Sequence, residues 1–238
     1  MLYLLRIQFT KPEWARKSDF YYAILGVILN LFEDQSAVYT SILKLSFSVG
    51  EQLEINMGIQ GEEWYNMIVS HLLSHPEQEL SINGSKCSLK QINFHFDLFD
   101  GEMGEYRDFN KFILRFHSPT FVRQQNITYL LPTPERIIAS LMSKFEQIYP
   151  SNIDQADFKK WLKNTLFVGE CKLESRLIQI KQGKKTGIVW FWTYYLSDKT
   201  NIDYVKYLYL LLKSVKYLGM WSGVRLGCGN VSCQILTK

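Results

Sequence analysis

The sequence predicts an α+β protein in which the order strand, helix, strand, strand, helix, strand occurs twice. Apolar and polar residues alternate in several short runs, as in half-buried strands, and apolar residues recur at helical spacing in other runs. An acidic stretch with two glycines, residues 97–108, separates the two series and is typical of a linker. The order is that of the ferredoxin-like fold, and 238 residues suffice for two small domains. We therefore expect two tandem ferredoxin-like (βαββαβ) domains, over residues 1–107 and 108–238.

The first half begins with an apolar strand over residues 2–9, which Lys11 and Pro12 end. Ser18 or Asp19 can cap the helix that follows, over residues 20–32, where apolar residues recur at helical spacing. The remaining elements expected in this half are strands over 38–47 and 51–59 around a turn at Gly50, a helix over 62–73, and one or two strands within 80–98.

The second half repeats the same order without an obvious repetition of sequence. It begins with a strand over residues 111–116 that leads into Ser118 and Pro119, and a helix follows over 134–149. The remaining elements expected are strands over 167–180 and 187–196 around a basic turn, a helix over 202–218, a glycine-rich stretch over 219–229, and a last strand over 230–236.

Composition indicates a soluble protein with a sizeable core, because 47% of the residues are hydrophobic and 21% are charged. The longest apolar stretch, residues 20–32, is shorter than the ~20 residues that span a bilayer, and the first ten residues lack the features of a signal peptide. The four cysteines show no CxxC spacing and have no accompanying histidine cluster. We therefore expect free thiols in a reducing cytoplasm, and neither a metal site nor a cofactor.

Charge is divided unevenly between the two halves. Residues 1–107 hold 8 Lys and Arg against 14 Asp and Glu, a net −6, whereas residues 108–238 hold 19 against 9, a net +10. A basic half joined to an acidic one favours a polyanionic partner for the second half. The alternative is ordinary variation in solvated surface charge.

The glycine-rich stretch, residues 219–229, is the most distinctive motif. Glycine allows positive φ and close backbone approach, so successive N–H groups can point at a phosphate. The stretch follows a helix and does not precede one, which excludes a dinucleotide-binding or Walker-type loop. The alternative is a simple connection or a bulged strand.

This stretch resembles the C-terminal glycine-rich loop of the CRISPR-associated endoribonucleases that process repeat RNA, the Cas-six type of the RAMP superfamily. Gly219, Gly227 and Gly229 match the outer glycines of that loop. Trp221 stands where the family usually has glycine, and Arg225 is the only charged residue left between the outer glycines. Residues 116–121, followed by 131–134 and a helix, resemble the start of the family's second domain. Residues 187–194 resemble its glycine-led central strand.

The resemblance implies antiviral defence through metal-independent cleavage of CRISPR repeat RNA into guide RNA. The 2′-hydroxyl beside the scissile phosphate attacks it, which leaves a 2′,3′-cyclic phosphate and a 5′-hydroxyl. The implied partners are the repeat RNA and, as further candidates, other CRISPR effector subunits, with the protein itself a monomer or a homodimer. Members of the family often use a histidine near the first helix or second strand, but this chain has no histidine within residues 20–47.

Three accounts of the catalytic groups therefore remain open. Tyr39 and Lys44, with Tyr22 as a third member, can supply the proton donors and the cation in the stretch where the family site lies. A histidine from elsewhere, with His117 as the first candidate, can reach the site instead. The third account is a non-catalytic subunit that holds or caps guide RNA. Each residue also has a structural alternative: Tyr22 in the core, Tyr39 at the start of a strand, and Lys44 facing solvent.

Contacts to RNA are expected mainly from the second half. The candidates are basic residues of the turn between two predicted strands and residues of the glycine-rich stretch: Lys181, Lys184, Lys185, Gly219, Ser222, Arg225, Gly227 and Gly229. A structured repeat presents an A-form stem whose deep groove admits side chains poorly, so charge along its backbone must carry much of the recognition. The alternative for the lysines is a solvated turn.

Overall fold

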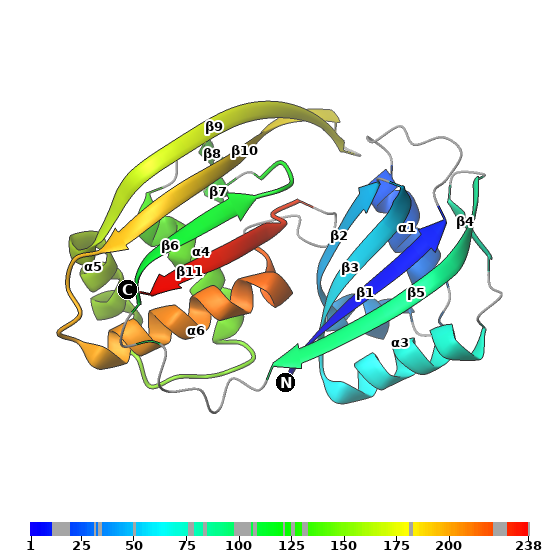
Figure 1. The fold of residues 1–238 in the computed structure, drawn as a ribbon, viewed down its shortest axis with the longest axis horizontal. Coiled ribbons are helices and arrows are strands. Elements are labelled where there is room, and N and C mark those ends of the chain that lie inside the picture. Colours follow the sequence, from blue (N-terminus) through cyan, green and yellow to red (C-terminus); the bar gives the residue numbers. More distant parts are fainter. Residues whose placement is uncertain are drawn as a thin grey trace. The chain divides into compact units, whose positions relative to one another are not determined.

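The protein is described by a computed structural model, in which each of two compact units is built on one large antiparallel sheet with helices (Figure 1). The first unit consists chiefly of Met1–Leu98, and the second of Phe99–Leu177, Thr186–Ser222 and Gly229–Lys238. The residues that the structure describes are 1–10, 20–30, 32, 35–49, 51–75, 79–82, 85–97, 106, 109–120, 122–124, 127–129, 133–180, 183–220 and 228–237. Most of residues 97–108 lie outside this part, so the domain boundary at 107/108 stays a prediction.

The first unit is a ferredoxin-like domain whose sheet has the order β2-β3-β1-β5-β4. Its central strand, β1, pairs antiparallel with β3 on one side and β5 on the other. The strands are β1 (Leu2–Thr10), β2 (Ile42–Val49), β3 (Gln52–Gln60), β4 (Glu79–Ile82) and β5 (Ser85–Asp97), and the helices are α1 (Phe20–Leu29), α2 (Gln35–Ser41) and α3 (Glu62–Ser74).

The core of this unit lies on one face of the sheet. Leu5, Ile7 and Phe9 of β1 are buried and pack with Ile55 and Met57 of β3, whereas the polar residues between them belong to the other face. Ile24 and Ile28 of α1 and Ile68 and Leu72 of α3 complete the same apolar cluster. The alternation that predicted strands therefore also determines which face is covered by helices.

The second unit repeats the topology with the sheet order β11-β6-β10-β9, in which the first strand of the unit, β6, is again internal. Its strands are β6 (Phe109–Phe116), β9 (Leu166–Ile180), β10 (Gly183–Leu196) and β11 (Val231–Thr237), with a separate pair, β7 (Val122–Gln124) and β8 (Ile127–Tyr129). Its helices are α4 (Pro134–Phe145), α5 (Gln155–Thr165) and α6 (Ile202–Leu218). The prediction of two tandem ferredoxin-like folds is confirmed.

One predicted element is wrong in type. A strand was expected over residues 38–47, but residues Gln35–Ser41 form helix α2 and the strand begins only at Ile42. Val38 is fully buried and Ser41 nearly so, three residues apart on one helical face, and the Ser41 hydroxyl donates to the Val38 carbonyl at 2.8 Å. Burial of Val38 thus overrides the strand preference of a Val-Tyr-Thr run. Tyr39 consequently lies on a helix and not at the start of a strand.

No helix among the described residues is long and apolar enough to cross a membrane. The thiols of Cys87, Cys171, Cys228 and Cys233 are all free, as the sequence predicted.

Two of the motif stretches meet inside the second unit. A Cβ atom on Gly187, in β10, would lie 2.7 Å from Pro119 Cβ and 3.2 Å from both the Pro119 carbonyl carbon and the Thr120 nitrogen. Two of those three atoms belong to backbone and have little freedom to move. Residue 187 therefore has to be glycine for β10 to lie against the Ser118–Pro119 turn.

We predict that Gly187→Ala lowers the free energy of unfolding by ~1–3 kcal/mol, because the added methyl group forces backbone atoms apart. Gly26→Ala is the matched control. Gly26 lies within helix α1, and a Cβ atom added there would have no atom of the described residues within 4 Å beyond its own helical neighbours. There the same change should raise stability by roughly 0.5–1 kcal/mol, since alanine is the better helix former.

Urea denaturation of both variants and the parent, followed by far-UV circular dichroism, measures these changes. A Gly187→Ala variant that is as stable as the parent, or that gains stability as Gly26→Ala does, would contradict the close approach of β10 to the turn.

Candidate functional site

The glycine-rich stretch is fixed at both of its described ends. Helix α6 ends at Gly219, whose φ is 59°, and Gly229 has a φ of 64°. The Met220 N–H donates to the Gly229 carbonyl at 3.1 Å, so the two ends lie side by side. Positive φ is costly for residues with a Cβ, which explains glycine at both positions. Ser222, Arg225 and Gly227 lie outside the described residues.

A lysine side chain caps the C-terminal end of α6, where the glycine-rich stretch begins. Lys144 Nζ of α4 donates to the carbonyls of Leu218 and Gly219 at 3.3 and 3.4 Å. A cation at a helix C-terminus pairs with carbonyls that lack helical partners and with the negative end of the helix dipole. The start of the glycine-rich stretch is thereby tied to a second helix.

The far end of the stretch is tied to the Ser118–Pro119 turn. The Ser118 hydroxyl accepts from the Asn230 N–H at 2.9 Å, and the His117 N–H donates to the Asn230 carbonyl at 2.8 Å. Ser118 is buried, and its own carbonyl accepts from the Thr120 hydroxyl at 2.9 Å. His117 and Ser118, within the motif at 116–121, therefore fix the position at which the glycine-rich stretch ends.

His117, a candidate from the sequence, lies exposed at the end of β6. Its Nε2 is 2.7 Å from the Ser232 hydroxyl oxygen of β11. Since the hydroxyl can donate or accept, this contact is compatible with either protonation state of the ring.

The basic turn lies at the junction of β9 and β10. Lys184 and Lys185 belong to the first residues of β10, and their side chains lie outside the described part, as does Lys181 altogether. Their role in binding stays a prediction.

The proposed catalytic residues belong to three consecutive elements of the first unit. Tyr22 lies on α1, with its side chain outside the described part, and Tyr39 is 36% exposed on α2. Lys44 lies on β2 and is only 4% exposed, so the solvent-facing alternative for this lysine is wrong.

The pairing of β2 with β3 places Lys44 across from a glycine. The register shifts between Ile42 and Lys44, and Lys44 then lies opposite Gly58, which has no side chain. Burial lowers the pKa of the Lys44 ammonium to about 8, because the charged form loses hydration. A buried cation with a pKa close to neutrality is a feature of functional sites more often than of surfaces.

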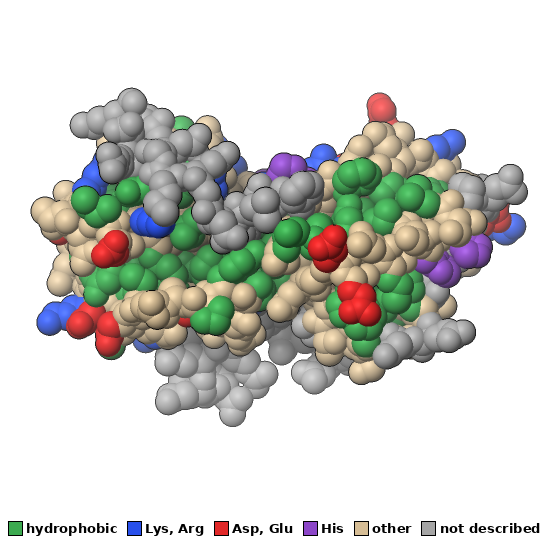
Figure 2. All heavy atoms as spheres, turned by 90° about the horizontal axis from the view of Figure 1, so that it is seen from below, with side chains coloured by type: hydrophobic (Ala, Val, Ile, Leu, Met, Phe, Trp, Pro, Cys, Tyr) green, Lys and Arg blue, Asp and Glu red, His purple; other side chains and the backbone are tan. Residues whose placement is uncertain are grey.

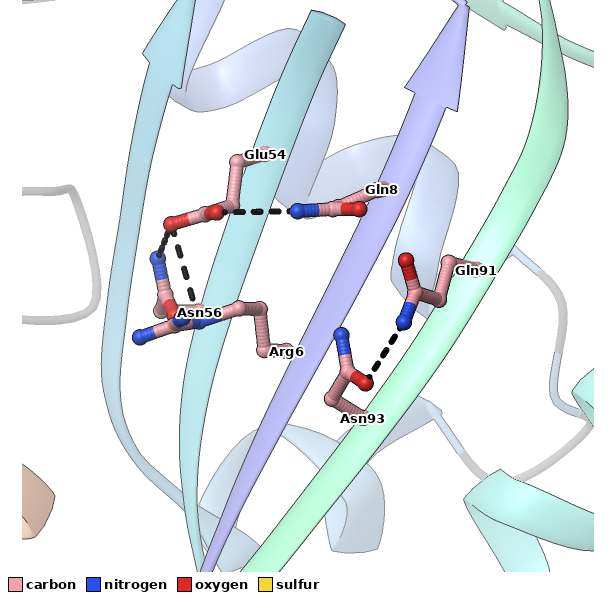
Figure 3. A network of polar contacts seen from close by, with 6 residues as sticks. All are labelled: Arg6, Gln8, Glu54, Asn56, Gln91 and Asn93. Carbon is pink, nitrogen blue, oxygen red and sulfur yellow. Dashed lines mark hydrogen bonds and ion pairs between the residues drawn. The ribbon is translucent and has the colours of Figure 1, made fainter.

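The same sheet carries a polar network on the face opposite the core (Figure 3). Arg6 Nε donates to Asn56 Oδ1 at 3.0 Å and lies 3.7 Å from Glu54 Oε1, which also accepts from Asn56 Nδ2 at 2.9 Å. Gln8 Nε2 donates to the other oxygen of Glu54 at 3.3 Å. On β5, Gln91 donates to Asn93 at 2.9 Å.

Glu54 remains a carboxylate within this network. Partial burial alone would raise its pKa, but hydrogen bonds from Asn56 and Gln8 and the charge of Arg6 hold the pKa below its usual value. Sequence reasoning missed this network. The sequence does contain a sign of this network, because polar residues recur at alternate positions of β1, β3 and β5. That alternation predicts a polar face of the sheet, but it does not predict which strands are neighbours.

Charged side chains are scattered on the face seen in Figure 2, where acidic and basic groups occur in both units without forming a patch of one sign among the residues drawn in colour. Within the described part of the chain, no group of three or more His, Cys, Asp or Glu side chains is placed to hold a metal ion.

Comparison with solved structures shows the same fold in proteins of low sequence identity. A Cas6 substrate-mimic complex matches with a TM-score of 0.77 and 20% identity, over 98% of this chain and 99% of that one. Thermus thermophilus Cas6 matches with a TM-score of 0.75 and 14% identity, over 98% of both chains. A protein described as a RAMP protein binding different RNA substrates matches with a TM-score of 0.60 and 11% identity, over 98% and 99%.

No curated protein sequence matches the chain. A family model does match it, that of the CRISPR-associated endoribonuclease Cas6, over residues 114–231. This range contains the Ser118–Pro119 turn, Gly187 and the whole glycine-rich stretch. Residues 114–231, about half of the chain, thus belong to the CRISPR-associated endoribonuclease Cas6 family.

Proposed function

We propose that the protein is a metal-independent endoribonuclease that cleaves CRISPR repeat RNA to give guide RNA. The observation that carries this proposal is the family match over residues 114–231, which covers the turn, the glycine-led strand and the glycine-rich stretch. Two structural neighbours support it, one a Cas6 protein in a substrate-mimic complex and one a RAMP protein binding different RNA substrates.

The reaction places few demands on the protein because the RNA supplies its own nucleophile. A base takes the proton of the 2′-hydroxyl, which attacks the adjacent phosphorus in line with the leaving 5′ oxygen. An acid protonates that oxygen, and a cation stabilises the additional negative charge of the phosphorane. The products carry a 2′,3′-cyclic phosphate and a 5′-hydroxyl.

RNA lies chiefly against the second half in this proposal. The net charge of +10 over residues 108–238 attracts the phosphates, with Lys181, Lys184, Lys185 and Arg225 in contact with them. Gly219 and Gly229 supply the backbone conformation that lets N–H groups of the glycine-rich stretch, including those at Ser222 and Gly227, approach the RNA.

Catalysis is assigned to Tyr39 and Lys44, with Tyr22 as the third member. The exposed Tyr39 phenol, on the helix directly before β2, can donate a proton to the phosphate or the leaving oxygen. The Lys44 ammonium stabilises the phosphorane. This ammonium is 4% exposed, so it acts on the phosphate only after bound RNA displaces groups that cover it.

We predict that Tyr39→Phe and Lys44→Met each slow single-turnover cleavage at saturating protein by ~10²–10⁴-fold, with little change in RNA affinity. Methionine keeps the buried stem of Lys44 packed while it removes the charge. Tyr195→Phe, at a tyrosine 44% exposed in the second unit, and Lys90→Met, at an exposed lysine of β5, are the matched controls and should cleave at the parent rate.

Full activity in both test variants, together with loss of activity in His117→Ala, would transfer the catalytic role to the histidine beside the Ser118–Pro119 turn. A parent protein that binds its repeat RNA tightly and leaves it intact would establish the non-catalytic alternative.

The pH dependence of cleavage tests the role of Lys44 separately. The proposed role needs the protonated amine, and the pKa of that amine is about 8 in the RNA-free protein. With protein below saturation, where the rate reports the free enzyme, cleavage should therefore fall as pH rises through about 8. Bound phosphate favours the charged form, so at saturating protein the fall should move to higher pH.

Lys44→Arg provides the control, because arginine stays protonated throughout this range. Its residual activity should show no fall near that pH. A parent profile that rises through the same range would mean that the neutral amine, acting as a base, is the active form.

A further inference from the structure

Strand β9 presents a long edge of the second sheet. Among the described strands its only neighbour is β10, and Figure 1 shows β9 along the outer side of that sheet. All residues from 167 to 176 are exposed, including Phe167 at 54% and Leu173 at 40%. An edge strand offers unpaired N–H and C=O groups to any further strand that reaches it.

The charges along this edge alternate in sign. Glu170, Lys172, Glu174 and Arg176 follow one another at every second position, so their side chains share one face of the strand. Natural edge strands commonly carry charges that discourage pairing, and a single sign does this best because two copies then repel. Charges that alternate in sign instead favour the pairing of two copies in one particular register.

That register is antiparallel, with a two-fold axis at Leu173. It places Glu170 opposite Arg176 of a second copy and Lys172 opposite Glu174, and the symmetry produces each pair twice. An axis at Lys172 would instead place Glu170 opposite Glu174 of the second copy. An axis at Glu174 would place Lys172 opposite Arg176 of the second copy. Both are pairs of like charge. Opposite charges directly across a sheet stabilise pairing and like charges destabilise it, so the register centred on Leu173, with four opposite-charge pairs, is the most favourable of these three.

Within one chain, Arg176 Nη2 lies 3.3 Å from Glu174 Oε2, with both side chains more than half exposed. Such exposed pairs contribute little and rearrange readily. On the other face of the strand, Leu173 would meet its own copy, which removes part of its exposed apolar surface from water.

We propose that two copies of this chain associate through β9, which joins their sheets into one continuous antiparallel sheet. The partner is a second copy because the charge order of β9 is complementary to itself. The association closes about a two-fold axis and leaves no equivalent edge for a third copy. It goes beyond the proposed nuclease function and does not depend on it.

Sedimentation equilibrium on the full chain tests this proposal with two charge variants. Lys172→Glu with Arg176→Glu makes this face of β9 uniformly acidic, and Glu170→Lys with Glu174→Lys makes it uniformly basic. Each variant alone should have a dimer dissociation constant raised at least ~10-fold, whereas an equimolar mixture should form the mixed dimer. Lys159→Glu with Lys160→Glu, at exposed lysines of α5, is the control and should dimerise as the parent does.

Cross-linking measures the register directly. In a Cys171→Ser background, Leu173→Cys should form an intermolecular disulfide under mild oxidation, because residues at the axis are direct cross-strand neighbours. Phe167→Cys in the same background should not, since residues 167 of the two copies would lie far apart along the strand. A parent that is monomeric at all concentrations, or a dimer unaffected by either charge variant, would overturn the proposal.

Discussion

The second unit is organised around the contact between Gly187 and the Ser118–Pro119 turn. A side chain at residue 187 would occupy space already filled by Pro119 and the backbone of Thr120. That close approach holds β10 against the end of β6. From the same turn the Ser118 hydroxyl and the His117 N–H reach Asn230, directly after Gly229.

The consequence is that the two described ends of the glycine-rich stretch are fixed by different elements and yet lie side by side. Gly229 is placed through the turn, and Gly219 through the end of α6 and Lys144. The hydrogen bond between Met220 and Gly229 then joins them. Residues far apart in sequence thus fix the two described ends of the glycine-rich stretch.

The order of elements could be predicted from sequence because it depends on local patterns. Helix α6 was predicted with its observed bounds, since Asn201 caps its start and Gly219 ends it. Helix α2 was missed because the burial of Val38 is a tertiary effect. The environment of Lys44 was beyond prediction for a similar reason: it depends on the pairing of β2 with β3, which puts Gly58 opposite the lysine. Long-range register likewise decides that Arg6 meets Asn56 and Glu54.

The central claim is that the chain cleaves repeat RNA by using the 2′-hydroxyl of the RNA itself, without a metal ion. The most direct measurement incubates the purified protein with its repeat RNA in EDTA and identifies the ends of the fragments. The account predicts cleavage that leaves a 2′,3′-cyclic phosphate and a 5′-hydroxyl, and no cleavage when the nucleotide before the scissile bond lacks its 2′-hydroxyl. Cleavage that stops in EDTA and returns with Mg²⁺, or that proceeds on the 2′-deoxy substrate, would contradict it.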